Sequence, residues 1–186
     1  MDAIVEAALK KWPNVPACYA WLALDARGDW YMRDDRIQHA GPFPHVKGSR
    51  IDHEKLREFI SRNYAADERG AWFFQNGPQR VYIELEAAPW VWRLQADPSS
   101  ADVVVTSHTG LPARVGDPFA DESGRLFLAS DFGLGIVHTL DMGVAGDAVE
   151  RGAWQPQEIE FAALVARFGY SLSPAAKAGE RGENER

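Results

Sequence analysis

The spacing of apolar residues along the chain predicts three amphipathic helices, because hydrophobic side chains recur every three or four positions. The three segments are residues 3–12, 53–66 and 156–168. Pro13 ends the first helix, and Asp52 is expected to cap the second. Leu56, Phe59 and Ile60 form the stripe of the second helix that should face the core.

Alternation of apolar and polar residues predicts a run of short strands. The clearest strand is residues 80–86. Val81, Ile83 and Leu85 share one of its faces, and Tyr82 and Glu84 lie on the other, which should be exposed to solvent. The other expected strands are residues 18–24, 30–33, 72–75, 90–94, 103–106, 126–130 and 136–140. Glycine-containing turn sequences between several consecutive strands predict that these strands form hairpins.

The order of these elements predicts an α+β fold. The strands follow one another with short turns instead of alternating with helices, which favours a mostly antiparallel sheet of successive hairpins with three packed helices. We expect a single domain over residues 1–172, with two small subdomains that meet near residues 97–100 as the alternative. Residues 173–186 lack an apolar stripe, so the sequence predicts a disordered tail there.

Composition limits the class of protein. The 186 residues are 46% hydrophobic, enough to bury a core and too apolar for a disordered chain. The formal net charge of −7 argues against nucleic acid as a partner. No uncharged run is long enough to cross a bilayer, and the first residues do not form a signal peptide. We therefore expect a cytoplasmic protein without a membrane partner. Its single cysteine, Cys18, cannot form an intramolecular disulfide.

No sequence motif defines a catalytic, cofactor-binding or phosphate-binding site. The best candidates for catalysis are His108, Asp131 and His138, with Asp141 close to the last of them. If their strands are neighbours, these side chains could form a cluster for metal-dependent or hydrolase-like chemistry. The alternative is a pair of core histidines that bond to the backbone.

Two further histidines, His39 and His45, lie close to Asp34 and Asp35 in an expected loop. Their spacing defines no zinc geometry, so we expect solvated loop histidines. The sequence therefore predicts no metal site, and it names no cofactor.

Aromatic residues are the densest feature, with seven Trp, nine Phe and five Tyr. Trp30, Tyr82, Trp90 and Trp92 are the candidate binding residues, because aromatic side chains on the second face of a sheet form ligand grooves or protein interfaces. The alternative is that helices cover this face and all four belong to the core. The first functional hypothesis is a non-enzymatic binding or interaction module, with a second copy or another protein as partner. The second is a small enzyme that uses the histidine–aspartate cluster.

Three segments resemble a known protein family. They are residues 11–16 (KWPNVP), 21–25 (WLALD) and 72–82 (WFFQNGPQRVY). Together they resemble a family of uncharacterised proteobacterial proteins known as a domain of unknown function, over about the first half of the chain. The resemblance implies a small bacterial cytosolic protein, and it transfers no activity, cofactor or catalytic residue.

Overall fold

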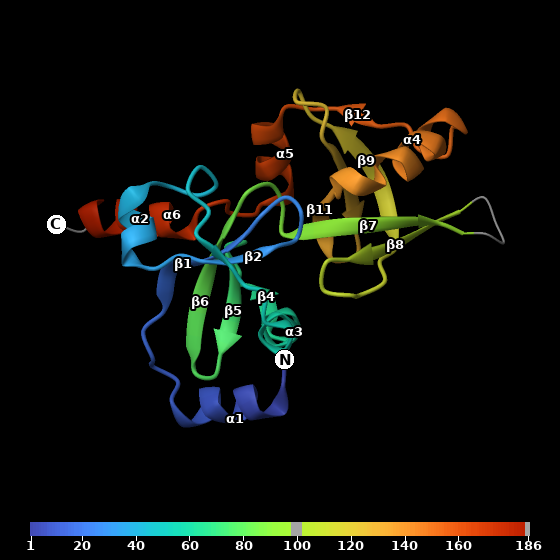
Figure 1. Ribbon diagram of the computed structural model, residues 1–186. Helices are drawn as coiled ribbons and strands as arrows, with labels where there is room; N and C mark the ends of the chain where they lie inside the picture. The colour runs from blue at the N-terminus through green and yellow to red at the C-terminus, as the bar shows by residue number, and fades with distance from the viewer. Residues whose placement is uncertain (98–101, 185–186) are drawn as a thin grey trace. The chain divides into compact units, whose positions relative to one another are not determined.

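The computed structural model describes residues 1–97 and 102–184, and the chain divides into two compact units (Figure 1). Unit 1 comprises Met1–Asp25, Asp29–Glu86 and Tyr170–Arg186, and unit 2 comprises Ala26–Gly28 and Ala87–Gly169. Each unit has its own six-stranded sheet. Among the described residues, seven of the ten strand pairings are antiparallel. The predicted α+β class is therefore confirmed, in its form with two subdomains.

The sheet of unit 1 has the strand order β3-β2-β1-β6-β5-β4. Its strands are β1 (Cys18–Leu24), β2 (Trp30–Met32), β3 (Ser49–Arg50), β4 (Tyr64–Ala66), β5 (Trp72–Asn76) and β6 (Gln79–Leu85). The pairs β1–β2 and β5–β6 are hairpins, as the turn signals predicted. A parallel pairing of β1 with β6 joins them, so these two strands end at the same edge of the sheet.

The helices of unit 1 are α1 (Ala3–Lys11), α2 (Asp35–Ala40), α3 (Glu54–Arg62) and α6 (Pro174–Asn184). Helices α1 and α3 correspond to the first two predicted helices, whereas α2 replaces part of an expected loop. Asp34 explains α2, because its Oδ1 accepts a hydrogen bond from Ile37 N at 3.0 Å. Helix α3 ends earlier than expected because the following residues pair with β5. His53 caps this helix in place of Asp52.

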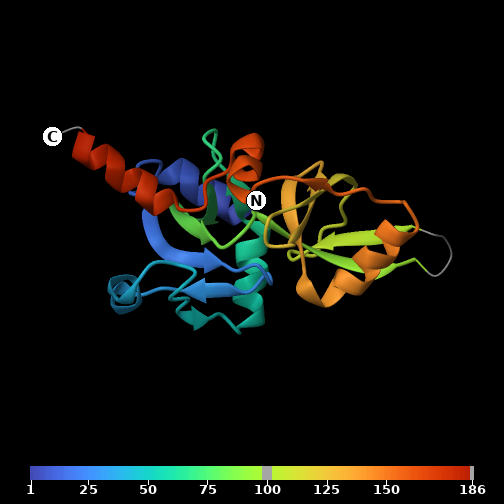
Figure 2. The ribbon, with the colours of Figure 1, turned by 90° about the horizontal axis from the view of Figure 1, so that it is seen from above.

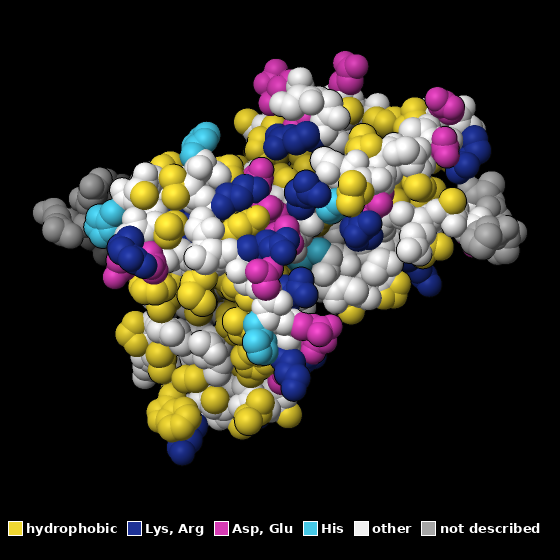
Figure 3. Space-filling model, viewed as in Figure 1, with side chains coloured by type: hydrophobic (Ala, Val, Ile, Leu, Met, Phe, Trp, Pro, Cys, Tyr) yellow, Lys and Arg dark blue, Asp and Glu magenta, His cyan; other side chains and the backbone are white. Residues whose placement is uncertain are grey.

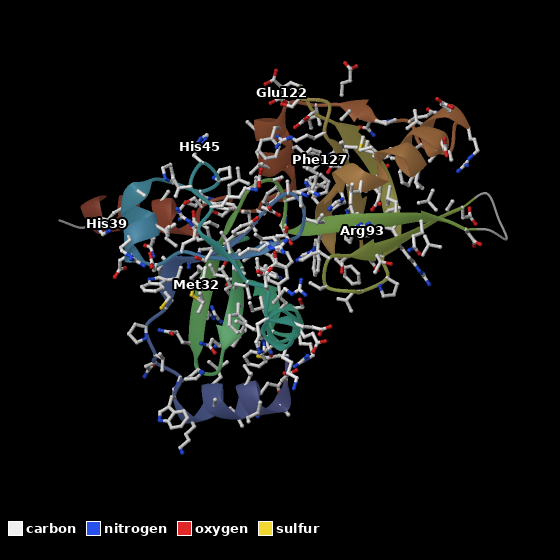
Figure 4. All side chains as sticks on the ribbon, in the orientation of Figure 1. Met32, His39, His45, Arg93, Glu122 and Phe127 are labelled. Atoms are coloured by element: carbon white, nitrogen blue, oxygen red, sulfur yellow. The ribbon has the colours of Figure 1, made fainter. Side chains whose placement is uncertain are left out.

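An apolar groove of about 320 Å³ lies between α3 and one face of the sheet of unit 1. Leu56 and Phe59 of α3 line it together with Met32 of β2, and the Phe59 ring packs edge-on against Phe74 at 5.4 Å. Figure 3 shows hydrophobic side chains gathered on this part of unit 1, and Figure 4 labels Met32 there. The groove leaves Leu56 and Phe59 only half-buried, whereas Ile60 is 1% exposed.

We expect Ile60→Ala to lower the free energy of unfolding by about 2–3 kcal/mol, in the lower half of the usual range for such truncations. The neighbouring groove allows the site to collapse partly around the missing atoms, which limits the cost. Urea unfolding followed by circular dichroism measures the loss. Arg57→Ala, on the exposed side of α3, is the control and should change stability by less than about 0.5 kcal/mol. Equal losses in the two variants would contradict the assigned core face.

Unit 2 has the strand order β12-β9-β10-β11-β7-β8. Its strands are β7 (Trp90–Ala96), β8 (Val103–Ser107), β9 (Val115–Ala120), β10 (Leu126–Ser130), β11 (Gly133–Val137) and β12 (Gln157–Glu158). Its helices are the 3₁₀ helix η1 (Thr139–Asp141), α4 (Met142–Glu150) and α5 (Phe161–Phe168). Strand β9 and helix α4 occupy segments that the sequence predicted to be loops, and α5 begins later than the third predicted helix.

The boundary between the units differs from the one that the sequence suggested near residues 97–100. Asp97 N donates to Asp102 O at 3.1 Å, so this segment connects the antiparallel pair β7–β8 inside unit 2. Residues 98–101 of the suggested boundary lie outside the described residues. Apart from the short stretch Ala26–Gly28, which belongs to unit 2, the chain passes from unit 1 to unit 2 at Glu86–Ala87 and returns at Gly169–Tyr170.

The C-terminal segment forms helix α6, where the sequence predicts a disordered tail. Figure 2 shows α6 starting beside the sheet of unit 1 and running outward to the C-terminus. Leu85 N donates to Leu172 O at 2.8 Å, and Ala175 N donates to Glu84 Oε1 at 3.3 Å. These bonds hold the segment against the face of β6 that alternation predicted to be wet, so Tyr82 and Glu84 are both buried. Burial raises the pKa of Glu84.

Candidate binding site

The predicted histidine–aspartate cluster does not come together in unit 2. His108 N donates to Val91 O on one side of β7, whereas His138 N donates to Trp92 O on the other side. Neighbouring strands lie about 4.8 Å apart, so the two histidine backbones are separated by about 10 Å. Asp131 is exposed in the turn before β11, and His138 follows the opposite end of that strand. Within the described residues, no group of three or more His, Cys, Asp or Glu could hold a metal ion.

Two members of this set have local structural roles. His138 begins η1, where its Nδ1 accepts a hydrogen bond from Leu140 N at 3.0 Å. Asp141 accepts from Arg93 Nε at 2.6 Å, and the Arg93 guanidinium lowers the pKa of Asp141. Figure 4 labels Arg93 on β7 and shows His39 and His45 projecting from α2 and from the loop after it. The carboxylate of Asp141 is thus already engaged in an ion pair with Arg93.

The imidazole ring of His108 is enclosed by its neighbours. Its Nδ1 accepts from Val91 N at 3.3 Å, and the ring lies 5.8 Å from that of Trp90. A Cβ atom at Gly28 would lie only 2.8 Å from His108 Cβ, so glycine is required for this close approach. Burial lowers the pKa of His108 to about 3. The ring is therefore neutral in the folded protein near neutral pH, and its Nε2 atom is buried, which does not suit acid–base catalysis.

His108 should make the protein less stable in mild acid. We expect the free energy of unfolding to fall by about 1–2 kcal/mol between pH 6.5 and pH 5 because of this group. The folded pKa of about 3 lies below the ordinary value of 6.5, so in this range the unfolded chain binds a proton that the folded protein excludes. Stability is thus complete above pH 6.5 and is lost as the pH falls towards 3. Urea unfolding of the wild type and of His108→Gln at both pH values measures the difference, and parallel losses would contradict the burial of the ring.

All four aromatic binding candidates are buried. Their exposed fractions are 0% for Trp92, 2% for Trp30, 4% for Tyr82 and 6% for Trp90. The rings of Trp90 and Trp92 stack with their centroids 6.1 Å apart, and their indole N–H groups donate to backbone carbonyls. With these polar groups satisfied, the indoles can pack as core side chains. A recognition surface made by these residues needs at least one of them to be exposed in the free protein, and none of the four is.

Tyr82 nevertheless lines a pocket of about 300 Å³ in unit 1, which we call the tyrosine pocket. Its lining residues are Tyr19, Arg69, Ala71, Tyr82, Ser171, Pro174, Lys177 and Ala178. They come from β1, β6, the connection between β4 and β5, and the C-terminal segment with α6. Tyr19 and Tyr82 stack with their ring centroids 4.7 Å apart and their planes within 9° of each other. The pocket therefore has an aromatic wall on the face of the sheet that α6 covers.

Two cationic side chains border the tyrosine pocket. Arg69 bonds to Asp67 Oδ2 at 3.3 Å, which raises the pKa of Arg69, and Lys177 is exposed on α6. The same Asp67 oxygen accepts a hydrogen bond from the Tyr82 hydroxyl at 3.1 Å. Ser171 is buried at the pocket, and its Oγ has no hydrogen-bond partner within the described part of the chain. The pocket thus combines flat aromatic rings, positive charge and an unused hydroxyl.

A second polar cluster lies where the parallel strands β1 and β6 end. Lys47 Nζ lies 2.9 Å from Asp25 Oδ2 and 3.1 Å from Glu86 Oε2, and the Tyr31 hydroxyl donates to the same Asp25 oxygen at 3.2 Å. Burial opposes the charge on Lys47, but its bonds to the two carboxylates raise its pKa. The lysine therefore stays protonated, and the cluster ties the loop that contains Lys47 to the edge of the sheet.

Fold and site together define a two-unit α+β protein with a pocket on one sheet, in which the predicted histidine–aspartate cluster is not assembled. The model of the family DUF2944, described as "Protein of unknown function (DUF2946)", matches residues 1–175. The chain belongs to this family, which confirms the predicted membership of a family of unknown function and extends it beyond the first half of the chain.

No curated protein matches the sequence. Among solved structures, the chain is similar to a DUF1285 family protein from Shewanella baltica, with 16% sequence identity and a TM-score of 0.45. The similarity covers 68% of this chain and 91% of the other. None of the described helices is long and apolar enough to cross a membrane.

Proposed function

We propose that the protein is a non-enzymatic binding module that holds a small molecule in the tyrosine pocket. The observation that carries this proposal is the stacked pair of Tyr19 and Tyr82 beside Arg69 and Lys177 on one pocket. Ligand sites commonly combine an aromatic or apolar lining with a few polar groups that fix orientation. A volume of about 300 Å³ is at the lower end for such sites and suits a small metabolite.

The proposal keeps an aromatic sheet face as the binding surface, but it changes the residues. Of the four sequence candidates only Tyr82 lines the pocket, whereas Trp30, Trp90 and Trp92 pack in the cores of their units. The separation of His108 from His138 by β7 supports binding over acid–base chemistry, because a catalytic pair must reach a common substrate atom.

A blocked pocket tests this proposal. Ala178→Phe places a ring in the pocket, and Ala176→Phe adds the same ring at an exposed position of the same helix as the control. A library of cationic, neutral and anionic metabolites is screened by thermal unfolding of the three full-length proteins. We expect at least one compound to raise the melting temperature of the wild type and of Ala176→Phe by a few degrees, and to lose this effect with Ala178→Phe. The same shifts in all three proteins, or none in any, would overturn the proposal.

A further inference from the structure

The charges around the tyrosine pocket select the sign of its ligand. Arg69 and Lys177 approach the pocket from two different elements, and none of its described lining residues is acidic. The nearby carboxylate of Asp67 already accepts hydrogen bonds from the backbone of Arg69 and Ala71, at 2.9 and 3.0 Å, and from the Tyr82 hydroxyl. Asp67 also forms an ion pair with Arg69 at 3.3 Å, so Arg69, Lys177 and Asp67 together leave the rim of the pocket with one net positive charge, to which Lys177 contributes the cation that has no carboxylate in this pair.

The walls of the pocket select the shape of its ligand. Tyr82 belongs to a buried cluster with Ala71 and Phe73, and Tyr19 packs against this cluster. Aromatic rings attract other rings at centroid distances of about 4.5–7 Å. The lining also includes the small side chains of Pro174 and Ala178, both from α6. A flat, ring-containing molecule fits this combination better than a branched or extended one.

The buried hydroxyl of Ser171 supports a ligand with hydrogen-bond acceptors. Ser171 N donates to Gly70 O at 2.9 Å, which fixes the residue at the pocket. Its Oγ is buried and makes no hydrogen bond within the described part of the chain. A buried polar group without a partner costs stability, so such groups in native proteins call for an explanation. An acceptor oxygen on a ligand would supply the missing partner after rotation of the serine side chain.

We infer that the ligand of the tyrosine pocket is a small aromatic molecule with one anionic group, a carboxylate or a phosphate ester. This inference rests on the proposed function. The ring of the ligand packs beside Tyr19 and Tyr82, and its anionic group lies between Arg69 and Lys177. Charge-assisted hydrogen bonds from these cations are stronger than bonds between neutral groups.

Three probes of similar shape test the inference: benzoate, phenyl phosphate and neutral benzamide. Their binding to the full-length chain is measured by isothermal titration calorimetry at low ionic strength. We expect the two anions to bind at least tenfold more tightly than benzamide and to weaken as salt is added. Lys177→Gln should weaken both anions about tenfold and leave benzamide unchanged. Lys55→Gln, an exposed lysine on α3 that does not line the pocket, is the matched control and should change nothing.

Two further measurements separate the parts of the inference. Ser171→Ala should keep the melting temperature of the unliganded protein, because the hydroxyl has no partner to lose, and should weaken the anions severalfold. Inorganic phosphate should bind more weakly than phenyl phosphate if the ring contributes. Equal affinity of these two would overturn the aromatic part, and equal affinity of benzoate and benzamide would overturn the anionic part. Failure of all three probes would also overturn the inference, while the blocked-pocket screen still decides the proposed function.

Discussion

Replacing Trp92 by alanine is expected to lower the free energy of unfolding by about 3–5 kcal/mol. Trp92 is 0% exposed and is the largest fully buried side chain among the described residues. Its ring stacks on Trp90, and its Nε1 donates to Leu128 O at 3.0 Å. Alanine would leave a large cavity and a buried carbonyl without its donor, and each of these carries a cost. Urea unfolding measures the loss, and the slope of the free energy of unfolding against urea concentration should stay unchanged.

An exposed tryptophan provides the control for this experiment. Trp12 follows α1 and is 51% exposed, with Lys11 Nζ 4.4 Å from the centroid of its ring. Trp12→Ala should therefore cost less than about 1 kcal/mol. A loss for Trp92→Ala as small as that for Trp12→Ala would show that Trp92 lies at a surface, and the aromatic face predicted from the sequence would regain its support.

Turn chemistry explains which parts of the fold could be predicted from the sequence. The hairpin β1–β2 closes over Gly28 and the hairpin β5–β6 over Gly77, and both glycines have positive φ. These signals are local, so a single sequence contains them. The parallel pairings of β1 with β6 and of β7 with β11 join residues far apart in the chain, and no local pattern specifies them. The division into two units follows from these distant pairings.

Strand alternation identified the two faces of β6 but not what covers them. Alternation correctly predicts that Tyr82 and Glu84 share one face, but it wrongly predicts that this face is exposed to solvent. The cover comes from residues some ninety positions later, and it is held by hydrogen bonds from Ala175 N to the Glu84 carboxylate and from Leu85 N to Leu172 O. Because this cover depends on backbone groups and small side chains, it leaves no apolar stripe for a sequence pattern to detect.

The candidate site was only partly predictable for the same reason. Tyr82 was identified by its position in an alternating strand. Arg69, Ser171 and Lys177 come from two distant segments that share no motif, and only the fold brings them to one pocket. The histidines failed as a site because His108 and His138 flank β7 on opposite sides, and this depends on strand order, which the sequence did not define.

Gly135→Ala is expected to lower the free energy of unfolding by about 3 kcal/mol, through overpacking and a weakened hydrogen bond of Trp92. Gly135 pairs with Trp90 across β11 and β7. A Cβ atom there would collide with Nε1 and Cε2 of Trp92 and would lie 2.8 Å from Trp90 Cβ. The indole of Trp92 is fully buried and held by Leu128 O, so it has little room to move. Chemical denaturation of the variant measures the cost.

A double-mutant cycle shows whether this cost arises from the indole of Trp92. Phenylalanine lacks the indole nitrogen that the new methyl group would meet, so Gly135→Ala should cost at least about 1 kcal/mol less in a Trp92→Phe background than in the wild type. Gly116→Ala in β9, where a Cβ atom would meet nothing within 4 Å, is the control and should change stability by less than about 0.5 kcal/mol. Strict additivity of Gly135→Ala and Trp92→Phe would mean that the methyl group is accommodated elsewhere. In that case, glycine at position 135 would be required for some reason other than the close approach of β11 to the Trp92 ring.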